Sequence, residues 1–120
     1  MCTKLEWTLL MTIVVLVIAA TLLITPCLAQ QHLPPAEYDR PYTGKLTVEV
    51  VTLAQLLATC STALASSLGC AFPGPNRCRI ILLDEAHIQA VGWTVELMLR
   101  HERAHCNGWP GDHPGKRPYP

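Results

Sequence analysis

The stretch TVELMLRHERAHCNG, residues 94–108, carries signals for both ends of a helix, and the fold is worked out from it in both directions. Thr94 stands where an N-cap residue is expected, because its hydroxyl can accept a hydrogen bond from a backbone N–H of the first helical turn. Gly108 stands just past the last helical position, as glycines that end helices commonly do. We therefore predict a helix from Thr94 to Asn107.

Two histidines and a glutamate lie near the end of this predicted helix. His101 and His105 are four residues apart, so their imidazoles project from one face and can bind the same metal ion. Glu102 lies beside them, one residue further round the helix, where it can hold a water molecule next to the metal. This HExxH spacing is typical of zinc hydrolases, in which the metal lowers the pKa of a water and the glutamate takes its proton.

Residues 101–108, HERAHCNG, are similar to the HExxHxxG segment of the metzincin branch of zinc metallopeptidases. A short strand ahead of the helix is also similar to the zincin core, so the resemblance covers roughly residues 79–113. The resemblance implies a Zn²⁺ cofactor bound by His101 and His105. It also implies Glu102 as the catalytic general base and a peptide or protein as the substrate.

The third metal ligand departs from the metzincin pattern. That pattern places it three residues after the glycine, at Gly111 in this chain, and glycine has no side chain to offer. Asp112 and His113 follow directly, and the turn at Pro110 and Gly111 can bring either one back toward the metal. We favour His113, because imidazole is the commoner zinc ligand in such sites, and Asp112 is the alternative. Arg103 and the lack of a Met-turn also depart from the pattern.

Two strands and another helix are predicted upstream. Residues 46–51, LTVEVV, alternate apolar and polar side chains, and residues 79–83, RIILL, form a short apolar run. Between them, Thr52 and Gln55 form a capping box that starts a helix. Its apolar face consists of Leu53, Leu56, Leu57, Cys60, Leu64 and Leu68. Gly69 is predicted to end this helix.

The order of these elements predicts the fold class. A strand, a helix and a second strand favour a parallel pair with a right-handed crossover. With the metal-binding helix added, we predict an α+β fold, a small zincin-like minidomain of two short strands and two helices in the order β-α-β-α. Residues 72–76 are expected to form a turn and residues 84–92 a loop or an early helical turn. The lead-in over residues 30–44 is expected to be extended, and the tail from Trp109 irregular.

The N-terminal part of the chain has a different composition. Residues 7–24 carry no charge, and Cys27-Leu28-Ala29 supplies the small residues of a cleavage site. This layout is typical of a secretory signal peptide. The apolar run is also nearly long enough to cross a bilayer, so a retained membrane tether is the alternative. We predict a signal peptide or anchor over residues 1–29 and a zinc-binding domain over residues 30–120. The predicted location is periplasmic or secreted.

Four cysteines lie beyond the signal segment: Cys60, Cys70, Cys78 and Cys106. An even number of cysteines in a small exported domain predicts disulfides that support a limited core. Four cysteines allow three pairings, and the sequence does not choose among them. The pairing we favour joins Cys70 to Cys78 across the proline-rich loop and Cys60 to Cys106 between the two helices.

The charge balance excludes one class of partner. The chain has nine basic and nine acidic residues, so it offers no basic surface for nucleic acid. The leading hypothesis is an exported zinc-dependent hydrolase, a peptidase, with His101, His105 and His113 as metal ligands. The rival hypothesis is an exported zinc-binding or structural module without turnover, and a third is a membrane-tethered accessory protein. The sequence offers no partner for His32.

Overall fold

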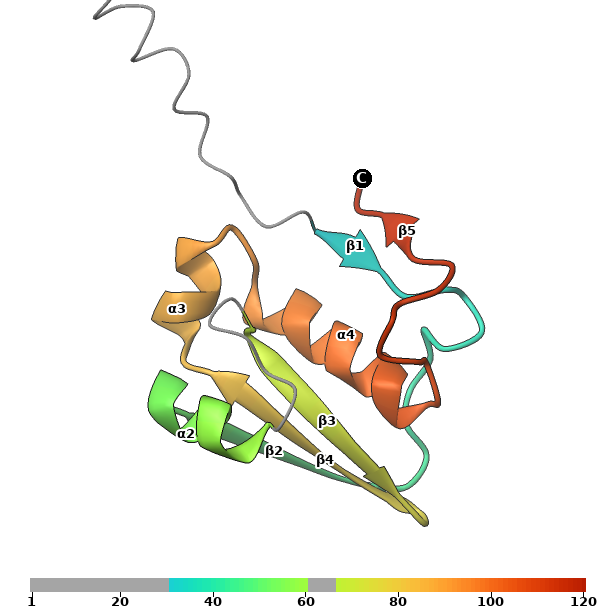
Figure 1. Ribbon diagram of the computed structural model, residues 1–120. Coiled ribbons are helices and arrows are strands. Elements are labelled where there is room, and N and C mark those ends of the chain that lie inside the picture. Colours follow the sequence, from blue (N-terminus) through green and yellow to red (C-terminus); the bar gives the residue numbers. More distant parts are fainter. Residues whose placement is uncertain (1–30, 61–66) are drawn as a thin grey trace, which may run out of the picture.

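Three strands form the central sheet of the computed structural model, which describes residues 31–60 and 67–120 (Figure 1). They are β2 (Lys45–Val51), β4 (Arg77–Leu83) and β3 (Gly69–Gly74), in the spatial order β2-β4-β3. β2 runs parallel to β4, and β3 runs antiparallel to it. The predicted parallel pair is therefore confirmed, and the α+β class with it.

The middle strand β4 provides the centre of the hydrophobic core. Its last four residues are almost completely buried, because helices cover both faces of the sheet there. A strand buried on both faces has a continuous apolar sequence instead of an alternating one, which explains the run from Ile80 to Leu83. In contrast, β2 is an edge strand of the described sheet, and Val50 is 65% exposed.

Helix α2 (Leu53–Thr59) begins as predicted and ends earlier. The Thr52 hydroxyl accepts a hydrogen bond from Gln55 N, and Gln55 Oε1 accepts one from Thr52 N, which completes the capping box. Cys60 is its C-cap. Residues 61–66, with Leu64 of the predicted apolar face, lie outside the described part of the chain.

The prediction that Gly69 ends a helix is wrong, because Gly69 is the first residue of β3. Residues 72–74, predicted as part of a turn, belong to the same strand, and the reversal falls at Pro75 and Asn76 (φ 54°). Proline and glycine made this segment look like a loop. An edge strand tolerates them, because Pro73 has no N–H to give a neighbouring strand and an edge does not require one.

Helix α4 (Val95–Cys106) packs across one face of the sheet, chiefly against β3 (Figure 1). The Thr94 hydroxyl accepts a hydrogen bond from Leu97 N at 3.1 Å, and Gly108 follows the helix with φ of 100°. Both predicted ends of the helix are therefore confirmed. Helix α3 (Glu85–Ala90) occupies the region for which a loop and a helical turn were both considered.

A small two-stranded ribbon lies on the other side of α4 from the sheet (Figure 1). It pairs β1 (His32–Leu33) with β5 (Arg117–Pro118) in antiparallel orientation. We call residues 31–44 the N-terminal strap. The strap continues from β1 along α4, so the extended lead-in and the irregular tail of the sequence prediction meet in space.

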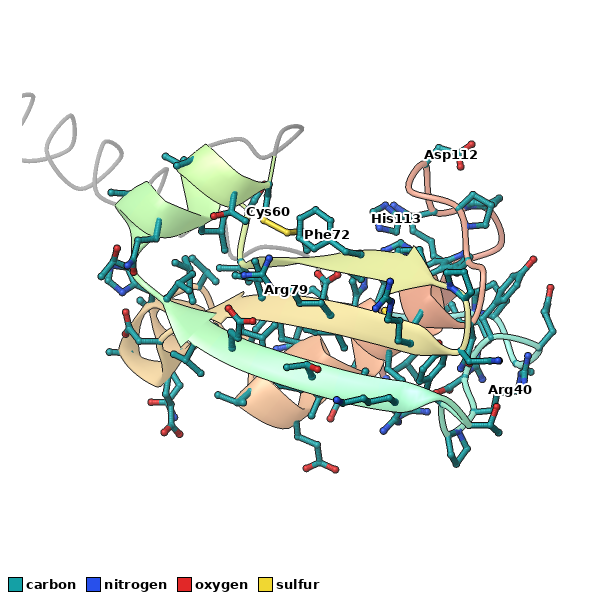
Figure 2. The ribbon with its side chains drawn as sticks, turned by 90° about the horizontal axis from the view of Figure 1, so that it is seen from below. Arg40, Cys60, Phe72, Arg79, Asp112 and His113 are labelled. Carbon is teal, nitrogen blue, oxygen red and sulfur yellow. A yellow bond between two sulfur atoms is a disulfide. The ribbon has the colours of Figure 1, made fainter. Side chains whose placement is uncertain are left out.

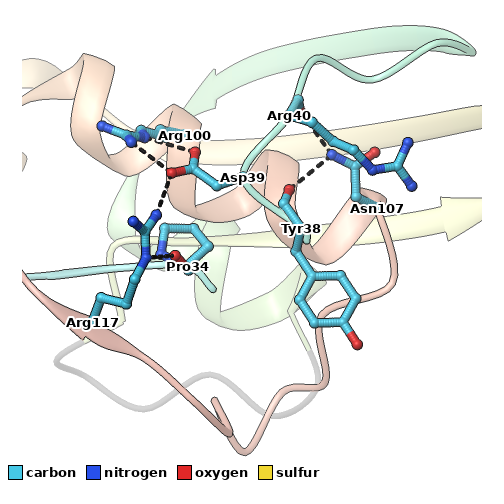
Figure 3. Close-up of polar contacts among 7 residues, drawn as sticks. All are labelled: Pro34, Tyr38, Asp39, Arg40, Arg100, Asn107 and Arg117. Carbon is cyan, nitrogen blue, oxygen red and sulfur yellow. Dashed lines mark hydrogen bonds and ion pairs between the residues drawn. The ribbon is translucent and has the colours of Figure 1, made fainter. Parts of the chain in front are cut away.

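Polar contacts bind the strap to α4 and to the tail (Figure 3). The Asp39 carboxylate, 10% exposed, accepts hydrogen bonds from Arg100 at 2.6 and 2.8 Å and from Arg117 at 2.6 Å. The Asn107 amide donates to the backbone carbonyls of Tyr38 and Arg40. The strap is therefore bound to α4 at two positions, Arg100 and Asn107.

We expect Asp39→Asn to lower the free energy of unfolding at pH 7 by about 1–2 kcal/mol, toward the lower end of the usual range for charged hydrogen bonds because both arginines are partly exposed. The hydrogen bonds from Arg100 are the main reason that the pKa of Asp39 lies below its usual value. A lowered folded-state pKa means that this contribution is present above the unfolded pKa of 3.8 and is lost as the pH falls through the folded value.

Urea unfolding of both proteins at pH 7 and at a series of acidic pH values would measure this difference, which should shrink as the pH falls below 3.8. Glu49→Gln is the matched control, because the ion pair of Glu49 with Arg79 lies in solvent and should contribute less. An equal effect of both substitutions would contradict the role assigned to Asp39.

Two disulfides are present, and their pairing corrects the one favoured from the sequence. Cys60 bonds to Cys70, and Cys78 bonds to Cys106. The sheet register gives the reason. Cys70 lies opposite Ile81 and Cys78 opposite Pro73, so the two cysteines point to opposite faces of the sheet and cannot meet. Cys78 faces α4, whereas Cys70 faces α2.

Loss of the Cys78–Cys106 bridge should destabilise the protein more than loss of the other one. Its cysteines are 28 residues apart in sequence, against 10 for Cys60 and Cys70. Chain-entropy arguments then give about 3.5 kcal/mol for the longer loop and about 2.7 kcal/mol for the shorter. Chemical unfolding of the two double cysteine-to-alanine variants would measure this order, and the reverse order would contradict it.

The disulfides indicate an oxidising, extracellular-type environment. Within residues 31–60 and 67–120, no helix is long and apolar enough to span a bilayer. The predicted signal or anchor over residues 7–24 and the cleavage site after Ala29 lie outside the described residues.

Candidate metal centre

Three imidazoles converge at the C-terminal half of α4. His101 and His105 project from the helix, and His113 comes back to them from the turn that follows. The three Nε2 atoms form a nearly equilateral triangle. The His101–His105 distance is 3.3 Å, and His113 lies 3.1 Å from each of the other two. The structure thus brings together the three residues that the sequence analysis proposed as metal ligands.

Trp109 fixes the orientation of His105. The Nδ1 atom of His105 lies 2.7 Å from the backbone carbonyl oxygen of Trp109, so that nitrogen donates, and its Nε2 carries a lone pair toward the centre. The Trp109 ring also stacks on His105, with 5.1 Å between centroids and 14° between planes. Trp109 is 2% exposed. It therefore packs over the helix end and also positions a histidine.

The turn after α4 directs His113 inward and leaves Asp112 outside (Figure 2). His113 N donates to the carbonyl of Pro110, and the Trp109 indole donates to the carbonyl of Pro114. His113 has φ of 57°, in the left-handed region that non-glycine residues seldom adopt. Asp112 is exposed. Strain of this kind persists where the surroundings fix a side chain for function.

Burial keeps the converging imidazoles neutral. Loss of solvent lowers the pKa of His101 to about 3 and that of His113 to about 4, and it also lowers the pKa of His105. The neighbouring imidazoles contribute a smaller effect in the same direction. Neutral imidazole is the form that binds metal ions.

Glu102 lies in the same cavity and is only 3% exposed. Burial raises its pKa to about 8. Gly69 of β3 provides the space for it, because a Cβ atom there would lie 3.2 Å from Glu102 Oε1 and 2.8 Å from Ile81 O. The glycine that looked like a helix end in the sequence is therefore a close-approach position between the edge strand and the helix.

A cavity of about 570 Å³ opens over these groups. The three converging histidines and Glu102 line one side of it, and residues of β3 line another. Because β3 is an edge strand of the described sheet, its backbone forms a wall of the cavity. An extended chain could lie along that wall.

His32 is the residue of this centre that the sequence analysis missed. Its ring lies 5.0 Å from that of His101 and 5.5 Å from that of His113, between centroids. One ring nitrogen from each of these three histidines lies within 4.8 Å of the others, close enough to hold a metal ion. No local pattern marks His32, which precedes His101 by 69 positions, so only the pairing of β1 with β5 reveals it.

Comparisons of the chain with protein-family models, with curated proteins and with solved structures find no match. What the centre can do therefore follows from its own geometry and chemistry.

Proposed function

We propose that this protein is an exported zinc-dependent hydrolase that cleaves peptide bonds. The observation that carries the proposal is the convergence of three imidazoles beside a buried glutamate in an open cavity. A disulfide-stapled helix holds two of these imidazoles, and a strained turn holds the third.

The spacing of the imidazoles supports zinc as the metal. Tetrahedral zinc with Zn–N bonds of about 2.0–2.1 Å separates its ligand nitrogens by about 3.3–3.4 Å. The Nε2 atoms of His101, His105 and His113 are 3.1–3.3 Å apart, so these three residues would hold the ion with little adjustment. Bound zinc would polarise a substrate carbonyl and lower the pKa of a water molecule.

Glu102 is the residue that favours a catalytic zinc site over a purely structural one. A structural zinc site has no need of a buried carboxylate beside its ligands, and burying one is unfavourable. With zinc bound, the positive charge of the ion would oppose the burial that raises the pKa of Glu102 to about 8 and favour the ionised carboxylate at neutral pH. In the proposed reaction, this carboxylate takes a proton from the attacking water and delivers it to the leaving amine nitrogen. Gly69 and the surrounding core keep this carboxylate close to the imidazoles.

The edge strand β3 supports a peptide substrate. Edge strands present unpaired backbone N–H and C=O groups, and an extended peptide can bind by adding a strand. β3 lies along the cavity that contains Glu102. A substrate paired with β3 would therefore have its backbone carbonyls next to the proposed zinc site.

One observation favours the rival function, a zinc-binding module without turnover. His32 provides a fourth imidazole near the centre, and four protein ligands are typical of structural zinc sites, whereas catalytic sites keep one position open. Hydrolysis distinguishes the two functions, since the rival predicts metal binding and no cleavage.

The test combines metal analysis with a cleavage assay. The purified protein should contain about one zinc per chain, and His101→Ala should contain almost none. His87→Ala is the matched control, because His87 lies on α3 with its side chain 56% exposed. The zinc-loaded protein and its His32→Ala variant should be incubated with a fluorogenic peptide library. Zinc binding with no cleavage by either protein would favour the rival, and a folded protein that takes up no zinc would contradict both.

A further inference from the structure

His32 reaches the metal centre from a segment that is independent of the other histidines. His101 and His105 belong to α4, and His113 belongs to the turn that follows it. Their ring centroids are 4.8–5.0 Å apart. The distances of 5.0 and 5.5 Å from His32 to His101 and His113 fall close to that range. The His32 ring is therefore spaced from those of His101 and His113 much as the three histidines of the helix and turn are spaced from one another.

The N-terminal strap places the His32 ring. In the β1–β5 ribbon, His32 lies opposite Pro118 and Leu33 opposite Arg117. Leu33 is buried, and Arg117 donates a hydrogen bond to the carbonyl of Pro34 at 2.7 Å. The rings of His32 and Trp93 also form a T-shaped contact, with 5.7 Å between centroids. These contacts hold the ring beside the centre.

We propose that His32 is the fourth ligand of the metal ion and that it closes the centre when the strap is in place. This inference rests on the zinc site proposed above. A ring nitrogen of His32 lies within 4.8 Å of ligand atoms of both His101 and His113. Zinc held by four side chains has no position for a water molecule or a substrate, so the strap decides whether the centre is open.

The fourth ligand can leave without disturbing the other three. The disulfide from Cys78 to Cys106 secures the end of α4, and the stacking of Trp109 secures His105. The strap is attached separately, through Asp39 and through the β1–β5 ribbon of two-residue strands. Release of β1 would therefore withdraw His32 and leave a three-histidine site with one open position.

Cobalt(II) substitution tests this inference without any substrate. Cobalt replaces zinc in histidine sites, and its visible absorption reports the number of ligands. Wild-type protein loaded with Co²⁺ should show a four-coordinate spectrum that azide leaves unchanged. His32→Ala should still bind Co²⁺, and azide should then alter its spectrum by taking the vacated position. His87→Ala should behave like wild type, because His87 pairs with Asp84 on α3, away from the centre.

Zinc affinity provides a second measurement. Loss of a residue that contacts the metal ligands but does not bind the metal itself typically weakens metal binding 10–100-fold. Loss of a direct ligand should exceed that range, so His32→Ala should weaken zinc binding by more than about 100-fold. His32→Gln, which retains a polar side chain of similar length, guards against misfolding of the alanine variant and should give the same result.

The outcomes separate the two proposals. A wild-type protein that binds metal and whose Co²⁺ spectrum responds to azide contradicts the role of His32 and leaves the zinc site standing. So does a His32→Ala variant with unchanged zinc affinity. A folded wild-type protein that binds neither zinc nor cobalt contradicts the proposed function, and this inference with it.

Discussion

Glu102→Gln is expected to leave zinc binding intact and to lower the rate of peptide hydrolysis by about 10²–10⁴-fold, the range typical of a lost general base. Glutamine has the same shape as glutamate and fits the space beside Gly69. It cannot accept a proton from water at neutral pH. Glu102 is not one of the three imidazole ligands proposed for the metal, so the metal should remain bound.

The control for this substitution lies on the same helix. Glu96 is exposed, belongs to the first turn of α4 and does not line the cavity, so Glu96→Gln makes the same chemical change outside the proposed site and should retain full activity. Steady-state kinetics on a peptide from the library, with zinc content measured in parallel, would give both values. A Glu102→Gln protein that hydrolyses the peptide at the wild-type rate would exclude Glu102 as the base.

His113→Ala is expected to lose zinc as completely as His101→Ala does, whereas Asp112→Ala should retain it. His113 Nε2 lies 3.1 Å from the Nε2 atoms of both His101 and His105. Asp112 is exposed on the outside of the same turn. Removal of His113 breaks the Nε2 triangle and leaves only His101 and His105 of it, with His32 more distant on the strap, whereas removal of Asp112 changes a solvated carboxylate.

Competition with a chromophoric chelator would measure these affinities. We expect Asp112→Ala to stay within about tenfold of wild type, at or below the lower limit for residues that support a ligand indirectly. If His113→Ala binds zinc normally while Asp112→Ala does not, the site has two histidines and one aspartate. His113 would then have no role in metal binding.

The secondary structure that the sequence predicted correctly depends on short-range signals. Thr94 and Gly108 mark the ends of α4, and Thr52 with Gln55 marks the start of α2. Each signal is a hydrogen bond or a backbone conformation within a few residues, and local physics is enough to define it. Strand β3 was missed because Pro73 and Gly74 have low strand propensity. Only its pairing with β4 overrides that preference.

The disulfides show where local signals are insufficient. Whether Cys70 can reach Cys78 depends on the register of β3 against β4, and a shift of one residue would turn a side chain to the other face of the sheet. The sequence contains the four cysteines, but it does not give that register. Packing of α4 and α2 on opposite faces then decides which partner each cysteine meets.

The metal centre, like the disulfides, could be predicted from the sequence only in part. The sequence by itself determined that His101 and His105 share one helical face with Glu102 beside them, because a spacing of four residues fixes this geometry in any α-helix. Only the tertiary structure decided that His113 turns inward while Asp112 faces solvent. It also decided that Gly69 makes room for Glu102. His32, from the N-terminal strap, reaches the centre for the same reason. The contacts of Gly69 and His32 join residues far apart in the chain, and those of His113 depend on the turn after α4. They form only when the strap, the edge strand and the final turn pack against α4.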